Sequence, residues 1–202
     1  MTVREAIIEI NNDFFVSNNN PSDIQKMIEN GVIDKVAIEN KWLGYPPATI
    51  QEINAKERQL GITLPPSFKE FLLVSNGFRR VSFFLDNLYS LEKVDWAKNI
   101  EERFFLELIE LNYFDCTDEE YFVYGDKQRP ELHRDRYILQ SLKLSDSYNG
   151  MCVYLNPIIR HGEEWEVLVY ATWYPGIRRY KSFKDYLIET HETNASLQAL
   201  DH

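Results

Sequence analysis

The sequence has no long apolar run. No stretch approaches the roughly 20 consecutive apolar residues that a membrane-spanning helix requires. The first residues, MTVREAIIEINNDFF, lack the basic start and the apolar run of a secretory signal. We therefore expect a cytoplasmic protein that has no membrane partner.

Cysteine and histidine are both scarce. The two cysteines, Cys116 and Cys152, are far apart and do not form the pattern of a disulfide framework, which fits a reducing compartment. The four histidines lie apart from one another and from both cysteines, and the chain contains neither a CxxC nor an HExxH motif. These absences predict neither a metal site nor a cofactor.

Motifs of catalysis and of phosphate binding are missing as well. The eight glycines form no GxGxxG motif and no P-loop, and there is no GxSxG nucleophile elbow. Cys116 lies among carboxylates, which disfavour the thiolate that a nucleophile needs. Acidic pairs such as Glu163 and Glu164 are too common in this chain to identify a catalytic pair. We therefore expect no enzyme, and we keep a hydrolase that uses a carboxylate or His133 as a third alternative.

The most informative part of the chain is the stretch 42–77, which predicts two helices. Thr49 and Glu52 form a capping box at the start of the first helix, and Gly61 offers a left-handed residue at its end. The second helix begins near residues 65–66, because proline is tolerated in a first helical turn. An Asn-Gly pair then ends both this helix and the stretch.

The rest of the chain predicts helices at both ends and strands between them. Helices are expected over residues 2–17, 22–30, 34–41, 94–111 and 183–191 or beyond. Strands are expected over residues 79–85, 121–124, 137–144, 151–155, 166–173 and 178–180. Strands and helices do not alternate, which argues against a doubly wound parallel sheet. We expect an α+β fold whose mixed, mostly antiparallel sheet has helices packed on one side or end.

Charge is unevenly distributed along the chain. The formal net charge is −10, and residues 86–135 alone carry 14 acidic and 6 basic side chains. A phosphate-binding surface needs the opposite sign, so we expect no nucleic-acid partner. A basic protein partner suits such a field, since complementary charge speeds encounter. A solvated acidic surface that only aids solubility is the alternative.

The densest acidic cluster lies between the expected helix 94–111 and the strand 121–124. We predict that it contacts a basic partner surface. The residues expected to make this contact are Asp115, Asp118, Glu119, Glu120, Tyr121 and Tyr124. The carboxylates would act as electrostatic anchors, and the tyrosines would add contact area unless they point inward. A solvated loop that makes no contact is the competing interpretation.

A set of residues in a fixed order extends from the stretch 42–77 into the last third of the chain. Its first part is Trp42, Gly44, Pro47, Ile50, Glu57, Leu60, Gly61, Leu64, Pro65, Phe68, Phe71, Leu72, Asn76 and Gly77. Its second part is Leu155, Asn156, Pro157, Trp165, Glu166, Pro175, Gly176, Tyr180, Phe183, Tyr186 and Leu187. In this order the chain resembles the SUKH superfamily. We expect a helical extension over residues 1–40, a SUKH-like domain over 41–192 and a frayed tail over 193–202.

The resemblance implies a function as well as a fold. It implies an α+β domain without a catalytic site, in which the shared residues build the fold. Many bacterial members resemble immunity proteins, which bind and neutralise a cognate toxin, often a nuclease. Others resemble regulators of cell-wall assembly or signalling scaffolds. We therefore expect a non-enzymatic module that binds a cognate toxin or another basic protein, with a regulatory or scaffold role as the alternative.

Overall fold

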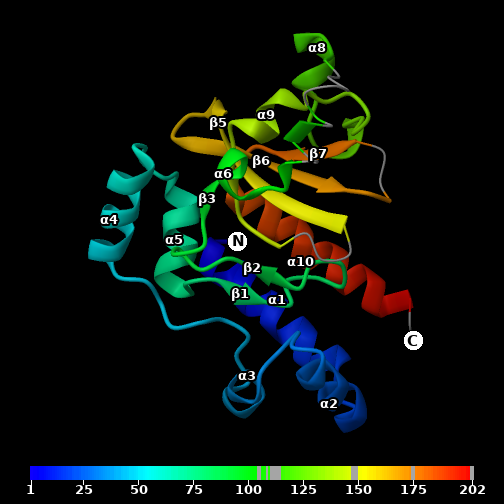
Figure 1. Ribbon diagram of the computed structural model, residues 1–202. Coiled ribbons are helices and arrows are strands. Elements are labelled where there is room, and N and C mark those ends of the chain that lie inside the picture. The colour runs from blue at the N-terminus through cyan, green and yellow to red at the C-terminus, as the bar shows by residue number, and fades with distance from the viewer. Residues whose placement is uncertain (104–105, 108, 110–114, 147–149, 174–175, 201–202) are drawn as a thin grey trace.

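The computed structural model (Figure 1) describes residues 1–103, 106–107, 109, 115–146, 150–173 and 176–200. The helices are α1 (Val3–Ser17), α2 (Pro21–Glu29), α3 (Lys35–Asn40), α4 (Ile50–Leu60), α5 (Pro66–Val74), α6 (Ala97–Ile100), α8 (Asp118–Tyr121), α9 (Arg136–Leu139) and α10 (Phe183–Leu200), with a 3-10 turn at Gly125–Lys127. The strands are β1 (Phe78–Arg79), β2 (Asn87–Leu88), β3 (Asp95–Trp96), β4 (Leu142–Lys143), β5 (Met151–His161), β6 (Glu164–Ala171) and β7 (Ile177–Tyr180).

The main sheet has the strand order β3-β4-β5-β6-β7, and every neighbouring pair is antiparallel. The long pair β5 and β6 forms its centre, with Val153 opposite Val169 and Leu155 opposite Val167. The strands β1 and β2 pair separately. The α+β prediction with a mostly antiparallel sheet is therefore confirmed.

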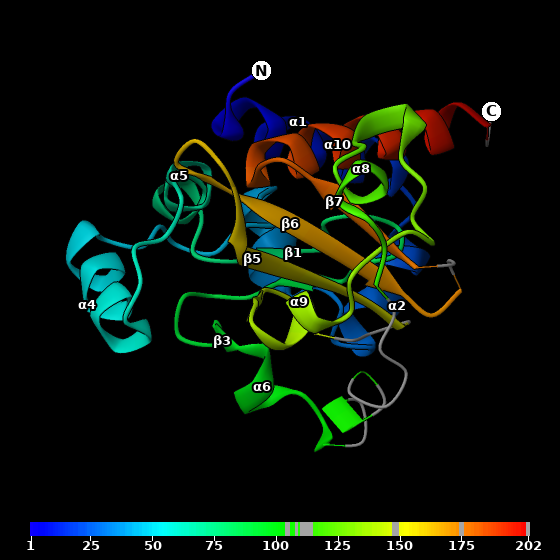
Figure 2. The same ribbon diagram turned by 90° about the horizontal axis from the view of Figure 1, so that it is seen from above.

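Both faces of the main sheet are covered, which the alternation of side chains along β5 and β6 makes clear. Val153 and Val167 point into the larger core, which also contains buried residues of α1, α5 and α10. Tyr154 and Leu168 point to the opposite face, where they pack with Tyr121 and residues of α9. Figures 1 and 2 show α1 and α10 on one side of the sheet and α9 on the other.

The caps predicted at Thr49, Glu52 and Gly61 are confirmed, and similar caps occur at two other helices. Capping boxes occur at the starts of α1 and α4, and Gly61 ends α4 in the left-handed conformation, at φ 71°. Ser182 accepts a hydrogen bond from the backbone N–H of Asp185 at the start of α10. These features form correctly because a cap depends on residues only three positions apart.

The two ends of the chain are more integrated than expected. The buried face of α1 belongs to the larger core, so this part of the expected extension is not separate from it. At the other end, α10 continues to Leu200, where a frayed tail was expected from residue 193. Asn194 donates to the carbonyl of Val81, and Gln198 donates to that of Asp13, which holds the last turns against the body of the protein. The domain boundary at residue 41 stays a prediction.

Several expected strands are wrong or only partly correct. Tyr121 ends the short helix α8, and residues 122–124 after it do not form a strand. Residues 137–144 begin within α9 before the two-residue strand β4. The strand expected over 79–85 is reduced to β1. The helix expected over 94–111 starts with β3 and is interrupted after α6, and much of its second half lies outside the described residues.

The outer edge of β7 is closed by side chains and backbone from the segment before α9. The side-chain amide of Gln128 donates to the carbonyl of Arg179 at 2.8 Å and accepts from its backbone N–H at 2.6 Å. The carbonyl of Pro130 accepts from the N–H of Ile177 at 2.9 Å. Gln128 thus replaces the backbone partner that an edge strand would otherwise lack.

Candidate functional site

The acidic segment, residues 115–120, lies on the sheet face opposite to α10. Thr117 and Glu120 form a capping box that starts α8: the Thr117 hydroxyl accepts from the Glu120 N–H, and the Glu120 carboxylate accepts from the Thr117 N–H at 3.0 Å. Glu120 is therefore used in part to build the helix. Asp118, Glu119 and Glu120 are all exposed, as the prediction of a contact surface requires.

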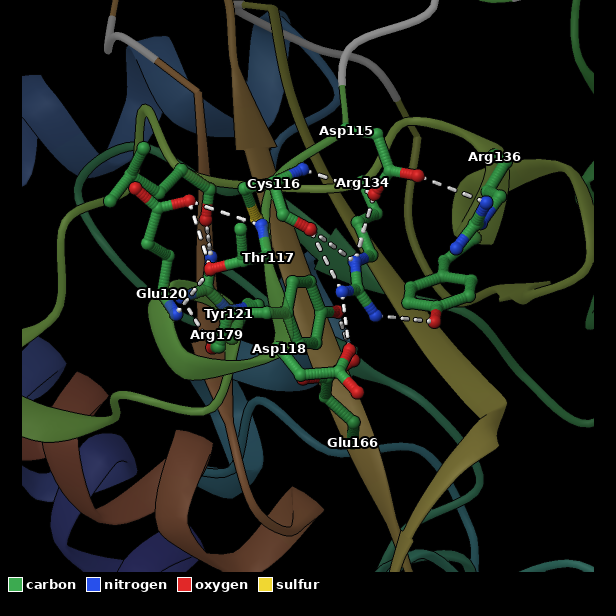
Figure 3. A network of polar contacts seen from close by, with 12 residues as sticks. Asp115, Cys116, Thr117, Asp118, Glu120, Tyr121, Arg134, Arg136, Glu166 and Arg179 are labelled. Atoms are coloured by element: carbon green, nitrogen blue, oxygen red, sulfur yellow. Dashed lines mark hydrogen bonds and ion pairs between the residues drawn. The ribbon is translucent and has the colours of Figure 1, made fainter.

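One buried arginine holds the acidic segment to the rest of the domain (Figure 3). The Arg134 guanidinium contacts the carboxylates of Asp115 at 2.9 Å and Asp118 at 2.5 Å. It also donates to the carbonyl of Cys116, and Arg136 contacts Asp115 at 3.1 Å. Two of the four predicted carboxylate anchors are thus paired within the protein, and their field toward a partner is weakened. The sequence analysis did not anticipate this pairing.

The two tyrosines do not extend this surface as predicted. Tyr121 is only 1% exposed, because the helical turn of α8 directs its ring onto the sheet. Its hydroxyl donates to Glu166 at 2.7 Å, and the partly buried Tyr124 donates to the other oxygen of Glu166 at 2.7 Å. Tyr121 cannot offer contact area to a partner in this conformation. Both side chains instead fasten the acidic segment to β6.

Glu166 accepts both of these hydrogen bonds, and its side chain is fully buried. Besides the two tyrosines, the side-chain amide of Asn156 donates to it at 2.8 Å. Burial raises the pKa of Glu166, while the hydrogen bonds from Tyr121, Tyr124 and Asn156 and the nearby charge of Arg179 act in the opposite direction. A carboxyl group without access to solvent cannot exchange protons with a substrate, so this cluster is a poor basis for the hydrolase alternative.

Arg179 completes the buried polar layer from β7. Its guanidinium donates to the carbonyls of Leu132 at 2.6 Å, Tyr121 at 2.9 Å and Val123 at 3.3 Å. It also lies 4.5 Å from the centre of the Tyr121 ring. These contacts satisfy carbonyl groups at the end of α8 and in the segment that follows it, which this segment cannot pair by itself. Arg179 and Arg134 together fix the position of α8 relative to the sheet.

The buried carboxyl group gives stability a defined pH dependence. A folded-state pKa that is raised means that stability is fully present below the unfolded pKa of Glu166 and is lost as the pH rises toward the folded pKa. We expect Glu166→Gln to remove this decline, because glutamine does not ionise. Urea unfolding of both proteins across a pH series that starts below 4.5 measures it. Parallel curves for the two proteins would contradict the assignment.

The remaining predictions concern the Cys116 thiol, metal ligands and membrane-spanning helices. Burial raises the pKa of the Cys116 thiol, as expected in direction, and the carboxylates of Glu120 and Asp115 add to this effect against Arg134 and Arg179. No group of three or more potential metal ligands occurs among the described residues. In the part of the chain that the structure describes, no helix has the length and apolar character needed to cross a bilayer.

Most residues of the ordered set shared with the SUKH superfamily are buried within the domain. Leu64, Pro65, Phe68 and Trp165 are buried, Glu57 accepts from the N–H of Leu64 at 2.8 Å, and Asn76 accepts from that of Leu91 at 2.7 Å. Pro47 is exposed, and Pro175 lies outside the described residues.

Two tight packing contacts explain why glycine stands at two positions of this set. A side chain on Gly44 would overlap the hydroxyl of Ser75, and it would lie 2.5 Å from the Trp42 ring nitrogen, whose indole packs edge-on against Phe78. Gly77, at φ +95°, would meet the backbone N of Ser90 at 2.8 Å. Both positions therefore serve the fold rather than a partner.

Comparison with known protein families supports this structural interpretation. The model described as the SMI1 / KNR4 family (SUKH-1) matches residues 47–189, which is well over half of the chain. No curated protein matches the sequence.

Proposed function

Because the chain belongs to the SMI1 / KNR4 family (SUKH-1), we propose that it is an immunity protein that neutralises a cognate toxin by covering its working surface. This family generally binds other proteins and does not catalyse reactions. The exposed acidic segment supports the more specific proposal, because its charge suits a basic partner. A nuclease toxin is such a partner, since it must itself attract phosphate groups.

Inhibition of this kind requires a rigid surface rather than reactive groups. The acidic segment is attached to the sheet through Arg134, Arg179 and the Tyr121–Glu166 hydrogen bond, so little further ordering is needed on binding. Preorganisation of this kind reduces the entropic cost of association. With Asp115 and Asp118 paired to arginines, Glu119 is the carboxylate of the segment that is exposed and has no role in the helix cap. We propose it as the principal electrostatic contact.

Charge reversal in the acidic segment tests the proposal. In the triple variant that combines Asp118→Lys, Glu119→Lys and Glu120→Lys, we expect the association rate constant to fall by about 10- to 100-fold at low salt. The dissociation rate constant should change less. Glu119→Lys alone should account for a measurable part of this loss without disturbing the helix cap. The binding partner is the protein that co-purifies with the tagged chain at moderate salt, and stopped-flow mixing at two salt concentrations supplies the rates.

A matched control makes the result specific. Glu163 is exposed in the turn between β5 and β6, so Glu163→Lys changes the net charge by the same amount as Glu119→Lys at a different place. Its association rate should change much less. If the triple variant associates at the unaltered rate at low salt, the acidic segment is not the contact surface. If the partner is a component of wall assembly or signalling rather than a toxin, the regulatory alternative replaces the immunity role.

A further inference from the structure

A groove of about 400 Å³ opens between α10 and the sheet, on the face opposite to the acidic segment. We call it the α10 groove. It is lined by Phe84, Met151, Val169, Trp173, Tyr180 and Thr193 together with their neighbours. The groove follows from the alternation in β6 and β7, which turns Val169 and Tyr180 toward α10 while Leu168 and Arg179 face α8.

The mouth of the α10 groove carries two of the most exposed aromatic side chains among the described residues. Trp173 is 51% exposed and Phe84 is 44% exposed, and their ring centres lie 6.0 Å apart. Below them, Val169 and Ala171 form an apolar floor. Large rings around a desolvated hollow are the composition of binding hot spots, where tryptophan is especially enriched. An apolar patch next to a hollow of this size marks an interaction surface.

The charged groups of the groove indicate which partner it suits. Arg178 and Glu189 form an ion pair at 2.5 Å, and the Tyr180 hydroxyl lies 3.1 Å from the same carboxylate oxygen. The charges inside the groove therefore cancel, which leaves apolar contact as its main contribution. Besides Glu189, which Arg178 neutralises, α10 carries the carboxylates of Asp185 and Glu192 against the single lysine Lys184. Basic residues beside an apolar anchor would complement this helix.

We propose that the α10 groove is a second protein-binding surface, which takes an apolar side chain flanked by basic residues from another polypeptide. A second copy of this chain is a poorer occupant, since it would bring the same carboxylates of α10 against themselves. This proposal rests on the proposed function in one respect only, namely that the chain binds other proteins. The α10 groove lies on the other face of the sheet, so the protein can engage one partner through the acidic segment and another through α10.

Three methionines make the groove directly observable. Met151 lines it, whereas Met1 and Met27 lie elsewhere in the structure. With ¹³C-methyl methionine in the full chain, titration with the capped peptide acetyl-Lys-Leu-Phe-Leu-Lys-amide should shift the Met151 signal saturably and leave the other two in place. The same peptide with glutamates in place of its lysines should bind about fivefold or more weakly at low salt.

A pair of variants on α10 tests whether the groove itself is occupied. Thr193 is exposed and lines the groove, so Thr193→Trp should fill it from the solvent side and weaken peptide binding at least about tenfold. Ala195 is exposed on the same helix outside the lining, so Ala195→Trp adds the same ring and should leave binding unchanged. Far-UV circular dichroism checks that both variants fold.

The possible outcomes separate this proposal from the proposed function. Absence of a Met151 shift, or equal binding by the Thr193→Trp and Ala195→Trp variants, overturns the groove as a binding surface. Glu119→Lys should leave peptide binding unchanged while it slows association with the partner of the acidic segment. If Glu119→Lys weakens the peptide instead, the two surfaces are not independent and the proposal of a second site fails.

Discussion

Replacing Arg179 by leucine is expected to lower the free energy of unfolding by about 3–5 kcal/mol, a large part of the stability of a typical domain. The guanidinium is 1% exposed and donates to carbonyls at Leu132, Tyr121 and Val123. Leucine would leave these acceptors buried without a donor, and each such group costs roughly 1–3 kcal/mol. Urea unfolding followed by tryptophan fluorescence measures the loss.

The neighbouring arginine is the matched control. Arg178 lies on the opposite face of the same strand, is 28% exposed in its side chain and pairs with Glu189. Arg178→Leu should cost about 1 kcal/mol or less, as is usual for partly exposed ion pairs. Arg179→Leu should also increase hydrogen exchange in α8, because the carbonyls at the end of this helix and after it lose their donor. If the two variants are equally stable, the buried guanidinium does not hold α8 in place.

The second large effect is expected at Gly176. A β-carbon there would overlap the carbonyl oxygen of Pro130 and lie 2.8 Å from the backbone N of Glu131, and the residue has φ +94°. Gly176→Ala therefore combines left-handed strain with a backbone clash, and we expect it to lower the free energy of unfolding by about 2–5 kcal/mol. The backbone movement that relieves this clash would separate β7 from the segment that closes its edge.

A variant at Gly162 separates the effect of left-handed strain from that of the backbone clash. Gly162 has φ +68°, but a β-carbon there would have no neighbour within 4 Å. Gly162→Ala should therefore cost only the strain of about 1–2 kcal/mol. Thermal or urea unfolding of both variants measures the difference. Equal losses would mean that the close approach of Pro130 to Gly176 has no energetic consequence.

The helices of the stretch 42–77 could be predicted because their signals are local. Thr49, Glu52 and Gly61 act on backbone groups within one turn, and they occupy the expected cap positions. The same capping signal is present at Thr117 and Glu120, and it correctly marks the start of α8. The apolar run at residues 121–124 favoured a strand instead. Giving precedence to the cap would have predicted the helix.

The buried polar layer was harder to predict because both faces of the sheet are covered. In β6 the alternation places Glu166 with Leu168, and in β7 it places Arg179 with Ile177. A single covered face would put charged residues in solvent, so the pattern of these strands gives no sign that either residue is buried. Their positions depend on Tyr121, Tyr124 and other residues that are more than 40 positions away in the chain. Sequence periodicity contains no information about such distant partners.

The start of the helix predicted over residues 94–111 is wrong for a similar reason. Asp95 and Trp96 pair with β4, far along the chain, and this pairing overrides the local helical pattern. After α6, Glu101 turns inward to form an ion pair with Lys143 at 2.9 Å, and both side chains are buried. The glutamates of this segment therefore do not all lie on a solvent face.

The side chain of Gln128 has a consequence for how this protein can meet other chains. Its amide occupies both hydrogen-bonding groups of Arg179 on the outer edge of β7, and the carbonyl of Pro130 occupies the N–H of Ile177. β-augmentation, in which a foreign strand lengthens a sheet, is thereby blocked on this side. The same closure protects the folded chain from growing into fibrils through β7.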